Sequence, residues 1–80
     1  MAAMSSAPQA ILDAGGDASA ILSAALYRCT DEMQAGQVLH VISQNPSTRI
    51  HVRDWCCVTG HELLRTQEDG NETLFWIRKC

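Results

Sequence analysis

Residues 12–26, LDAGGDASAILSAAL, join a short apolar run to a helix-forming segment through two glycines. Gly15 and Gly16 predict a tight turn after a strand over residues 9–14. Asp17 is a residue type that often caps the first turn of a helix. The stretch therefore predicts a strand, a glycine turn and the capped start of a helix, whose first backbone N–H groups lack helical partners.

The helix that begins here is predicted to run over residues 18–33, which contain neither glycine nor proline, and Gly36 is expected to stop it. Its apolar side chains recur at helical spacing and form one stripe, made of Leu22, Leu26, Cys29 and Met33. A stripe of this kind predicts a helix that packs one face against a core.

The middle of the chain repeats this order of elements. Residues 37–43, QVLHVIS, are rich in aliphatic and β-branched side chains and predict a strand covered on at least one face. A second helix is predicted to start with Asn45 as its cap and Pro46 at its first position. It should end at about Thr59, because Gly60 follows.

The last third of the chain reads as a hairpin, with HELLRTQE and ETLFWIRK as strands around the turn DGN. The element order is then βαβαββ. We expect an α/β two-layer sandwich, in which a four-stranded mixed sheet carries two helices on one face. The domain should occupy residues 10–80, and residues 1–9 read as a disordered lead-in.

Composition excludes several classes of function. The formal net charge is −3 and no basic block is present, so direct binding of nucleic acid is not expected. No apolar run approaches the ~20 residues of a membrane span, and the N-terminus lacks the pattern of a signal peptide. We therefore expect a cytoplasmic protein that does not contact membranes.

The four cysteines are expected to be reduced thiols in such a compartment. Cys57 and His61 are four residues apart, but the sequence has no second pair of ligands at a suitable spacing, so no metal site is expected. Nothing in the sequence indicates another cofactor. The three histidines lie in three different predicted elements, which favours structural or surface roles: His40, His51 and His61.

Several short pieces of the chain occur together in a known family. They are LDAGG, MQAGQVL, NP, GHELL and EDG followed by FWIRK. In this order and spacing, over about residues 11–79, the chain resembles the TusA/SirA-like sulfur-carrier proteins. The resemblance implies the βαβαββ fold and the transport of sulfur as a cysteine persulfide. It also implies a cysteine desulfurase or another sulfurtransferase as partner.

The same resemblance places the family's C-P-x-P motif on residues 19–22, where this chain reads SAIL. Ser19 therefore stands where the family has its persulfide cysteine. A hydroxyl cannot hold a persulfide, and no general base is its neighbour in sequence. We expect Gly15, Gly16, Asp17 and Ser19 to form a partner-binding surface without chemistry of its own.

An alternative keeps sulfur transfer on another thiol. Cys80 is the last residue, where exposure is usual, and Cys57 lies about 100° round the second helix from Cys56. Cys57 and Cys80 are the alternative candidates for a thiol that carries sulfur, whereas Cys29 and Cys56 are expected in or near the core. We expect a monomer, and a disulfide-linked dimer through Cys80 is a further alternative.

Overall fold

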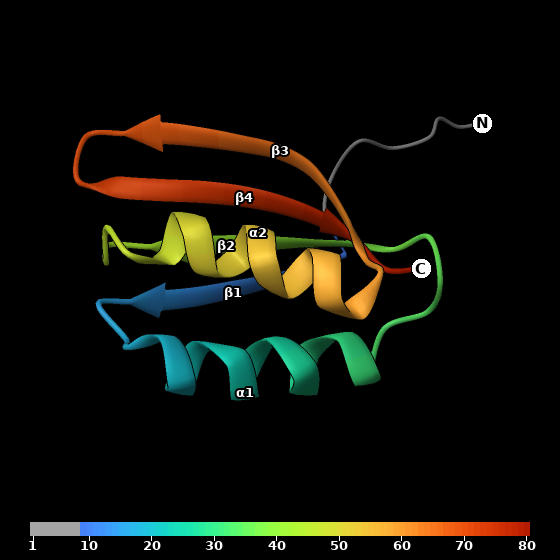
Figure 1. The fold of residues 1–80 in the computed structure, drawn as a ribbon. Helices are drawn as coiled ribbons and strands as arrows, with labels where there is room; N and C mark the ends of the chain where they lie inside the picture. Colours follow the sequence, from blue (N-terminus) through green and yellow to red (C-terminus); the bar gives the residue numbers. More distant parts are fainter. Residues whose placement is uncertain (1–8) are drawn as a thin grey trace.

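The computed structural model describes residues 9–80. Its elements follow the predicted βαβαββ order (Figure 1). They are β1 (Ala10–Gly15), α1 (Ser19–Asp31), β2 (Val38–Ser43), α2 (Thr48–Thr59), β3 (Glu62–Asp69) and β4 (Glu72–Arg78). Of the predicted lead-in, residues 1–8 lie outside the described residues.

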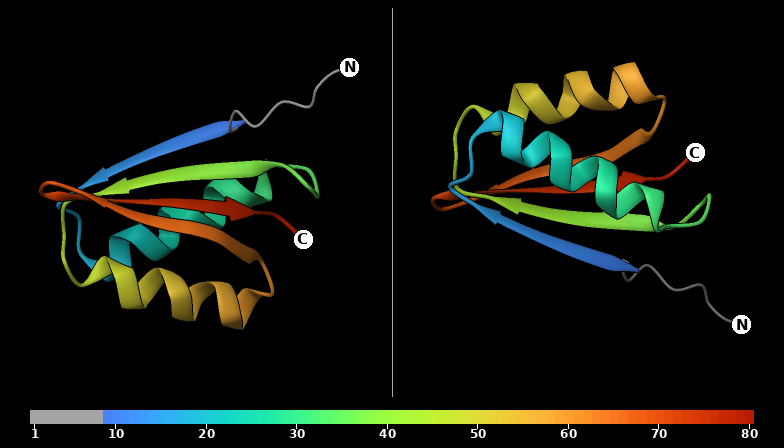
Figure 2. Two further views of the ribbon diagram at one scale, coloured as in Figure 1. Left: turned by 90° about the horizontal axis from the view of Figure 1, so that it is seen from above. Right: turned by 90° about the horizontal axis from the view of Figure 1, so that it is seen from below.

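The four strands form one mixed sheet in the order β1-β2-β4-β3. β1 and β2 are parallel, whereas β4 is antiparallel to both of its neighbours, β2 and β3. Figure 2 shows α1 and α2 on the same side of this sheet. The predicted α/β two-layer sandwich is confirmed.

The core lies between the sheet and the helices. Alternate residues of β2 and β4 point into it, and the register pairs Leu39 with Ile77 and Val41 with Phe75. The fully buried side chains that meet there come from both layers: Leu22, Leu26, Leu39, Val41, Val52, Phe75 and Ile77. The period of two in the strands and the stripe on α1 therefore converge on one apolar layer.

The opposite face of the sheet has no helix over it within the described residues. At its centre Trp76 stacks on His40, with ring centroids 4.5 Å apart, and the Arg65 guanidinium lies 5.1 Å from the ring of Trp76. His40 Nδ1 also lies 3.0 Å from the carbonyl oxygen of Phe75. This contact fixes the imidazole against the strand and gives His40 a structural role.

Both ends of α1 differ from the prediction. Ala18, not Asp17, occupies the cap position, and no side chain among residues 9–80 caps this end. Asp17 lies one residue too early, since a cap residue directly precedes the helix. At the other end α1 stops at Asp31 rather than near Met33, because the N–H groups of Glu32 and Met33 bond only three residues back. Gly36 lies in the loop and does not end the helix.

The start of α2 also differs. Asn45 and Pro46 precede the helix instead of opening it, and Ser47 is the cap residue. The carbonyl of Asn45 accepts the N–H of Thr48 at 3.0 Å, and its side-chain oxygen accepts the N–H of Ser47 at 3.0 Å. These bonds form a turn that delays the helix by two residues. The predicted end at Gly60 is confirmed, with φ +82° in the left-handed region.

Lys79 ties the end of β4 to the end of α1. Its Nζ donates to the carbonyl oxygens of Thr30 and Met33, the latter at 2.7 Å. A cation at a helix C-terminus is stabilising because the last carbonyls are unpaired and partly negative.

Removing that cation should therefore weaken the fold. We expect Lys79→Met to lower the free energy of unfolding by about 1 kcal/mol. Arg78→Met is the control, since Arg78 pairs with Glu62 at the surface and such pairs contribute little. Urea denaturation followed by circular dichroism would measure both variants, and equal losses would contradict this role for Lys79.

No helix within residues 9–80 combines the length and the apolar composition needed to cross a membrane.

Candidate partner-binding site

The loop between β1 and α1 turns sharply at Gly15. This residue has φ +53°, a backbone conformation that residues other than glycine rarely adopt. Its N–H donates to Asp13 Oδ1 at 3.1 Å, and the N–H of Asp17 donates to the carbonyl of Ala14 at 3.0 Å. The predicted glycine turn is present, and two local hydrogen bonds hold it.

A second loop, between β2 and α2, supports the first. The N–H of Gln44 donates to the carbonyl of Gly15 at 2.6 Å, and Asn45 Nδ2 donates to the carbonyl of Asp17 at 3.2 Å. The second loop is itself anchored by a buried bond of 2.8 Å between the hydroxyls of Ser43 and Thr48. The two loops therefore form one hydrogen-bonded platform at this end of the sheet.

The start of α1 rests on this platform. Ser19 is the first residue of α1, and no acidic residue lies in its first turn. The unpaired N–H groups of a helix start carry partial positive charge. Gly16, Asp17, Ala18 and Ala20 are exposed beside it.

Ile21 adds an apolar side chain to this surface that the sequence did not single out. It is 58% exposed, whereas Leu22, the next residue, is completely buried in the core. The helical stripe gives the reason, because Leu22 belongs to the inward face and Ile21 lies about 100° from it. We call Gly15, Gly16, Asp17, Ser19 and Ile21 the α1 surface.

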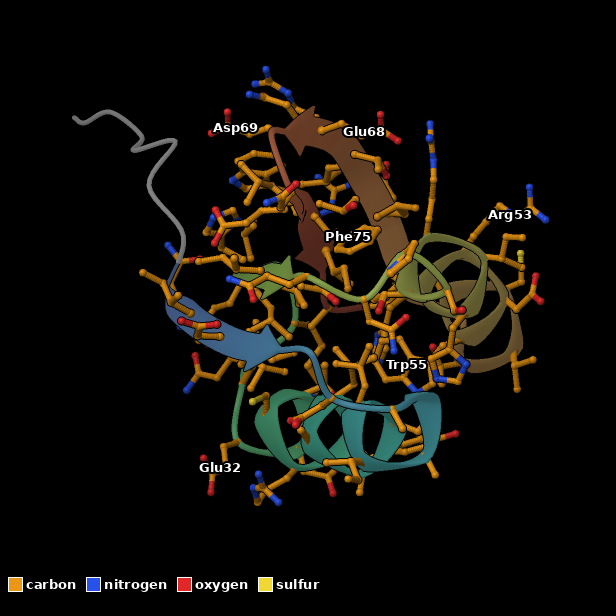
Figure 3. All side chains as sticks on the ribbon, turned by 90° about the vertical axis from the view of Figure 1, so that its left-hand side faces the viewer. Glu32, Arg53, Trp55, Glu68, Asp69 and Phe75 are labelled. Atoms are coloured by element: carbon orange, nitrogen blue, oxygen red, sulfur yellow. The ribbon has the colours of Figure 1, made fainter. Side chains whose placement is uncertain are left out.

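A cavity of about 590 Å³ adjoins the α1 surface. Gln44, which bonds Gly15, lines it together with Pro46 and the turn between β3 and β4. Arg49 Nη1 lies 2.5 Å from Glu68 Oε2 along its wall, so the lining is polar. Figure 3 looks onto this end of the molecule, where Glu68 and Asp69 lie on β3, on the side away from α1.

The two helices are joined by contacts that no sequence pattern indicated. Ser23 Oγ lies 2.6 Å from His51 Nε2, and the ring of Tyr27 meets Trp55 edge-on at 5.5 Å. Figure 3 shows Trp55 between the helices. Ser23 lies one turn after Ser19, so these contacts fix the orientation of the α1 surface relative to α2.

The predicted site residues fall into two groups that the structure keeps apart. Gly15, Gly16, Asp17 and Ser19 lie together at the start of α1. Cys80 lies at the other end of the sheet, where β4 ends (Figure 1), and Cys57 lies in the last turn of α2. The two fallback thiols therefore belong to a different corner of the molecule.

All four cysteines are free within residues 9–80, and they differ in exposure. Cys57 and Cys80 are exposed, Cys29 is half-buried and Cys56 is buried, as predicted. Burial raises the pKa of the Cys56 thiol to about 11, and it also raises the pKa of Cys29. No group of three side chains suited to a metal ion lies in this part of the chain.

Alkylation of the native protein should follow this order. Because the thiolate is the nucleophile, we expect iodoacetamide at pH 8 to label Cys57 and Cys80 first and Cys56 last. Peptide mass spectrometry of samples quenched over time would measure the rates. Labelling of Cys56 as fast as that of Cys57 would contradict its burial, and a sample unfolded in urea provides the control.

Comparison with known proteins gives a consistent result. Residues 11–79 match the family described as "Sulfurtransferase TusA". A sulfur carrier protein TusA of Pseudomonas putida F1 is 43% identical over 72 residues, which cover 90% of each chain. A protein of the same description from Pseudomonas aeruginosa LESB58 is 37% identical over 76 residues, 95% of this chain and 96% of that one. The similarity therefore spans the whole described domain.

Proposed function

Since the chain belongs to the TusA family of sulfur carrier proteins, we propose that it serves sulfur transfer by binding a sulfur-relay protein through the α1 surface. Membership of this family implies partners that are sulfur-relay proteins. The partner we propose is a cysteine desulfurase or another sulfurtransferase. The pathway would be sulfur trafficking, tRNA thiolation or sulfur metabolism, with no direct contact to nucleic acid.

The observation that carries this proposal is that Ser19 opens α1 on the two-loop platform. That position has the features that activate a cysteine, namely a helix start with unpaired N–H groups and no acid in its first turn. A serine hydroxyl there cannot form a persulfide. The architecture of a sulfur-carrying site is thus retained while its reactive group is replaced.

The α1 surface has the chemistry of a docking site. Ile21 offers exposed apolar area beside small residues, which let a partner approach the backbone closely. The platform needs no rearrangement to present these groups, so little conformational entropy is lost on binding. These properties favour recognition by a protein over reaction with a small molecule.

A pair of matched substitutions tests the docking site. We expect Ile21→Glu to weaken binding of a cysteine desulfurase about tenfold or more, equivalent to about 1.4 kcal/mol. Ile50→Glu is the control, because Ile50 is similarly exposed, at 61%, but lies on α2. Isothermal titration calorimetry would measure both, and equal affinities for the two variants would contradict docking through the α1 surface.

A second candidate function is sulfur transfer on another thiol. It is favoured by the exposure of Cys57 and Cys80 within a family whose members carry sulfur. Cys57→Ser and Cys80→Ser, each incubated with a cysteine desulfurase and cysteine, separate the two thiols. Loss of an added sulfur atom in one variant alone would identify the carrier by mass spectrometry.

Either function suits a reducing cellular compartment. Four free cysteines on a single small domain are typical of proteins kept reduced in the cytoplasm. We propose that the protein acts there as a monomer.

A further inference from the structure

Two cationic side chains lie on the flank of α2 that faces away from α1. On the opposite flank His51 contacts Ser23 of α1. Arg49 precedes His51 by two residues and Arg53 follows it by two, so both project about 160° round the helix from it. Neither arginine therefore belongs to the contact between the helices or to the α1 surface.

A groove lies between this flank of α2 and β3. Its volume is about 290 Å³, and it is lined from α2 by Arg49, Ile50 and Arg53 and from β3 by Leu63 and Thr66. β3 is at the edge of the sheet, so no further strand closes this side within residues 9–80. Figure 3 shows α2 beside β3, with Arg53 on the outer side of the helix. We call these five residues the α2–β3 groove.

The α2–β3 groove is cationic. Two of its residues carry a positive charge and none carries a negative one, although the formal net charge of the chain is −3. Glu68 lies 2.5 Å from Arg49 and Asp54 lies 3.8 Å from Arg53, but these four side chains are 60–67% exposed. Ion pairs exposed to this degree contribute little, and each guanidinium has several N–H donors. Both arginines can therefore bind an anionic partner.

The groove also has an apolar part. Ile50 is 61% exposed, and Leu63 is half-buried against the core. An inorganic anion would leave these side chains in contact with water, whereas a segment of protein can cover them while its carboxylates meet the guanidiniums. Apolar burial together with arginine is typical of protein interfaces. The groove therefore favours an acidic segment of protein as its occupant.

The spacing of the two arginines indicates the form of that segment. Arg49 and Arg53 are four residues apart, which separates them by about 6 Å along the axis of α2. In an extended chain, side chains two residues apart point to the same side and lie about 6.6–6.8 Å apart. Two acidic residues with one residue between them would thus reach both arginines together.

We propose that the α2–β3 groove docks an extended acidic segment of a partner protein. Two carboxylates of that segment bind Arg49 and Arg53, and an apolar side chain beside them covers Ile50 and Leu63. This site is separate from the α1 surface, does not depend on the function proposed for it, and takes a partner other than the cysteine desulfurase. A protein docked at the α1 surface leaves this flank of α2 free, so the chain has room for two partners at once.

The experiment is a titration of the isotope-labelled protein with the synthetic peptide GSELELSG, followed by two-dimensional NMR. We expect the amide signals of α2 and β3 around the groove to shift, and those of the α1 surface to stay in place. The peptide GSKLKLSG, with the charges reversed, should cause no such shifts. Higher salt should weaken binding, because the charges on both sides are exposed.

Matched variants separate the groove from a general effect of charge. We expect Arg53→Met to weaken binding of the acidic peptide about three- to fivefold, and Ile50→Ser about threefold or more. Arg65→Met is the control, because it removes the same charge from β3, where Arg65 lies 5.1 Å from the ring of Trp76 on the open face of the sheet. Circular dichroism verifies that each variant is folded.

Several results would overturn the proposal. They are the absence of binding by the acidic peptide, equal binding by the two peptides, and equal weakening by Arg53→Met and Arg65→Met. Unchanged affinity in Ile50→Ser would also contradict it, as would sulfate alone causing the same shifts, since the site would then be one for small anions.

Discussion

Ser19→Cys is expected to convert the protein into an acceptor of persulfide sulfur. Incubated with a cysteine desulfurase and cysteine, the variant should gain close to one sulfur atom per molecule on the tryptic peptide of residues 1–28. The wild type should gain none on that peptide. The expected change is therefore from no transfer at this position to nearly complete transfer.

The physical reason is the environment that the structure gives to position 19. The first turn of α1 has unpaired N–H groups and contains no acidic side chain. Such a position lowers the pKa of a thiol, often to between about 3.5 and 7.5, and the thiolate is the reactive form. The hydrogen-bonded loops hold the backbone of this helix start in place, so the new thiol would be attached at a fixed point of the chain.

A matched variant on the same helix tests whether the position of the thiol, and not only its presence, determines the transfer of sulfur. Ala24 is exposed on α1 but lies beyond the first turn. We expect Ala24→Cys to gain little sulfur under the same conditions. Equal gain at residues 19 and 24, or no gain at residue 19, would contradict the view that the start of α1 retains the architecture of a sulfur-carrying site.

The largest expected effect on stability comes from the core. We expect Phe75→Ala to lower the free energy of unfolding by about 3–5 kcal/mol. Phe75 is completely buried and pairs with Val41 across the central strands, under both helices. A domain of this size has a total stability near the lower end of about 5–15 kcal/mol, so the variant should keep only about 0–2 kcal/mol and be marginally folded.

The neighbouring residue provides the control. Leu74 lies on the opposite face of β4, which no helix covers within residues 9–80, and it is only half-buried. We expect Leu74→Ala to cost about 1 kcal/mol or less. Urea denaturation would compare the two variants. Equal losses would contradict the assignment of one buried and one open face to the sheet.

The order of elements could be predicted from the sequence because several independent signals agree. Three of these signals depend on few neighbouring residues. They are the apolar stripe with Leu22 and Leu26, the alternation of buried residues around Phe75, and the glycine at residue 60 that ends α2. Tertiary contacts reinforce these local preferences, so the elements and the layers were predicted correctly.

Element ends were harder because individual hydrogen bonds, some local and some long-range, decide them. The start of α2 depends on a turn formed by Asn45, and the last carbonyls of α1 are bound by Lys79, almost fifty residues away in the chain. Asp17 was expected as a cap on residue type alone, but the backbone places Ala18 there. Residue preferences cannot show which of two adjacent positions the backbone selects.

In the candidate site, too, some features could be predicted from the sequence and others could not. The glycine turn, the helix start and the family resemblance were visible in the sequence, and the correspondence of Ser19 to the family's persulfide cysteine stays a prediction. The exposure of Ile21, the pairing of Ser23 with His51 and the placement of Cys80 on His61 were not visible there. These contacts join residues of different elements, and no periodicity within one element can reveal them.

The central claim, that the protein serves sulfur transfer by binding rather than by carrying sulfur itself, is tested most directly by one native mass spectrum. The wild-type protein, a cysteine desulfurase and cysteine would be mixed and measured without denaturation. We predict the mass of the complex, with no sulfur atom added to this chain. A wild-type chain carrying an added sulfur atom, or the absence of any complex, would contradict the claim.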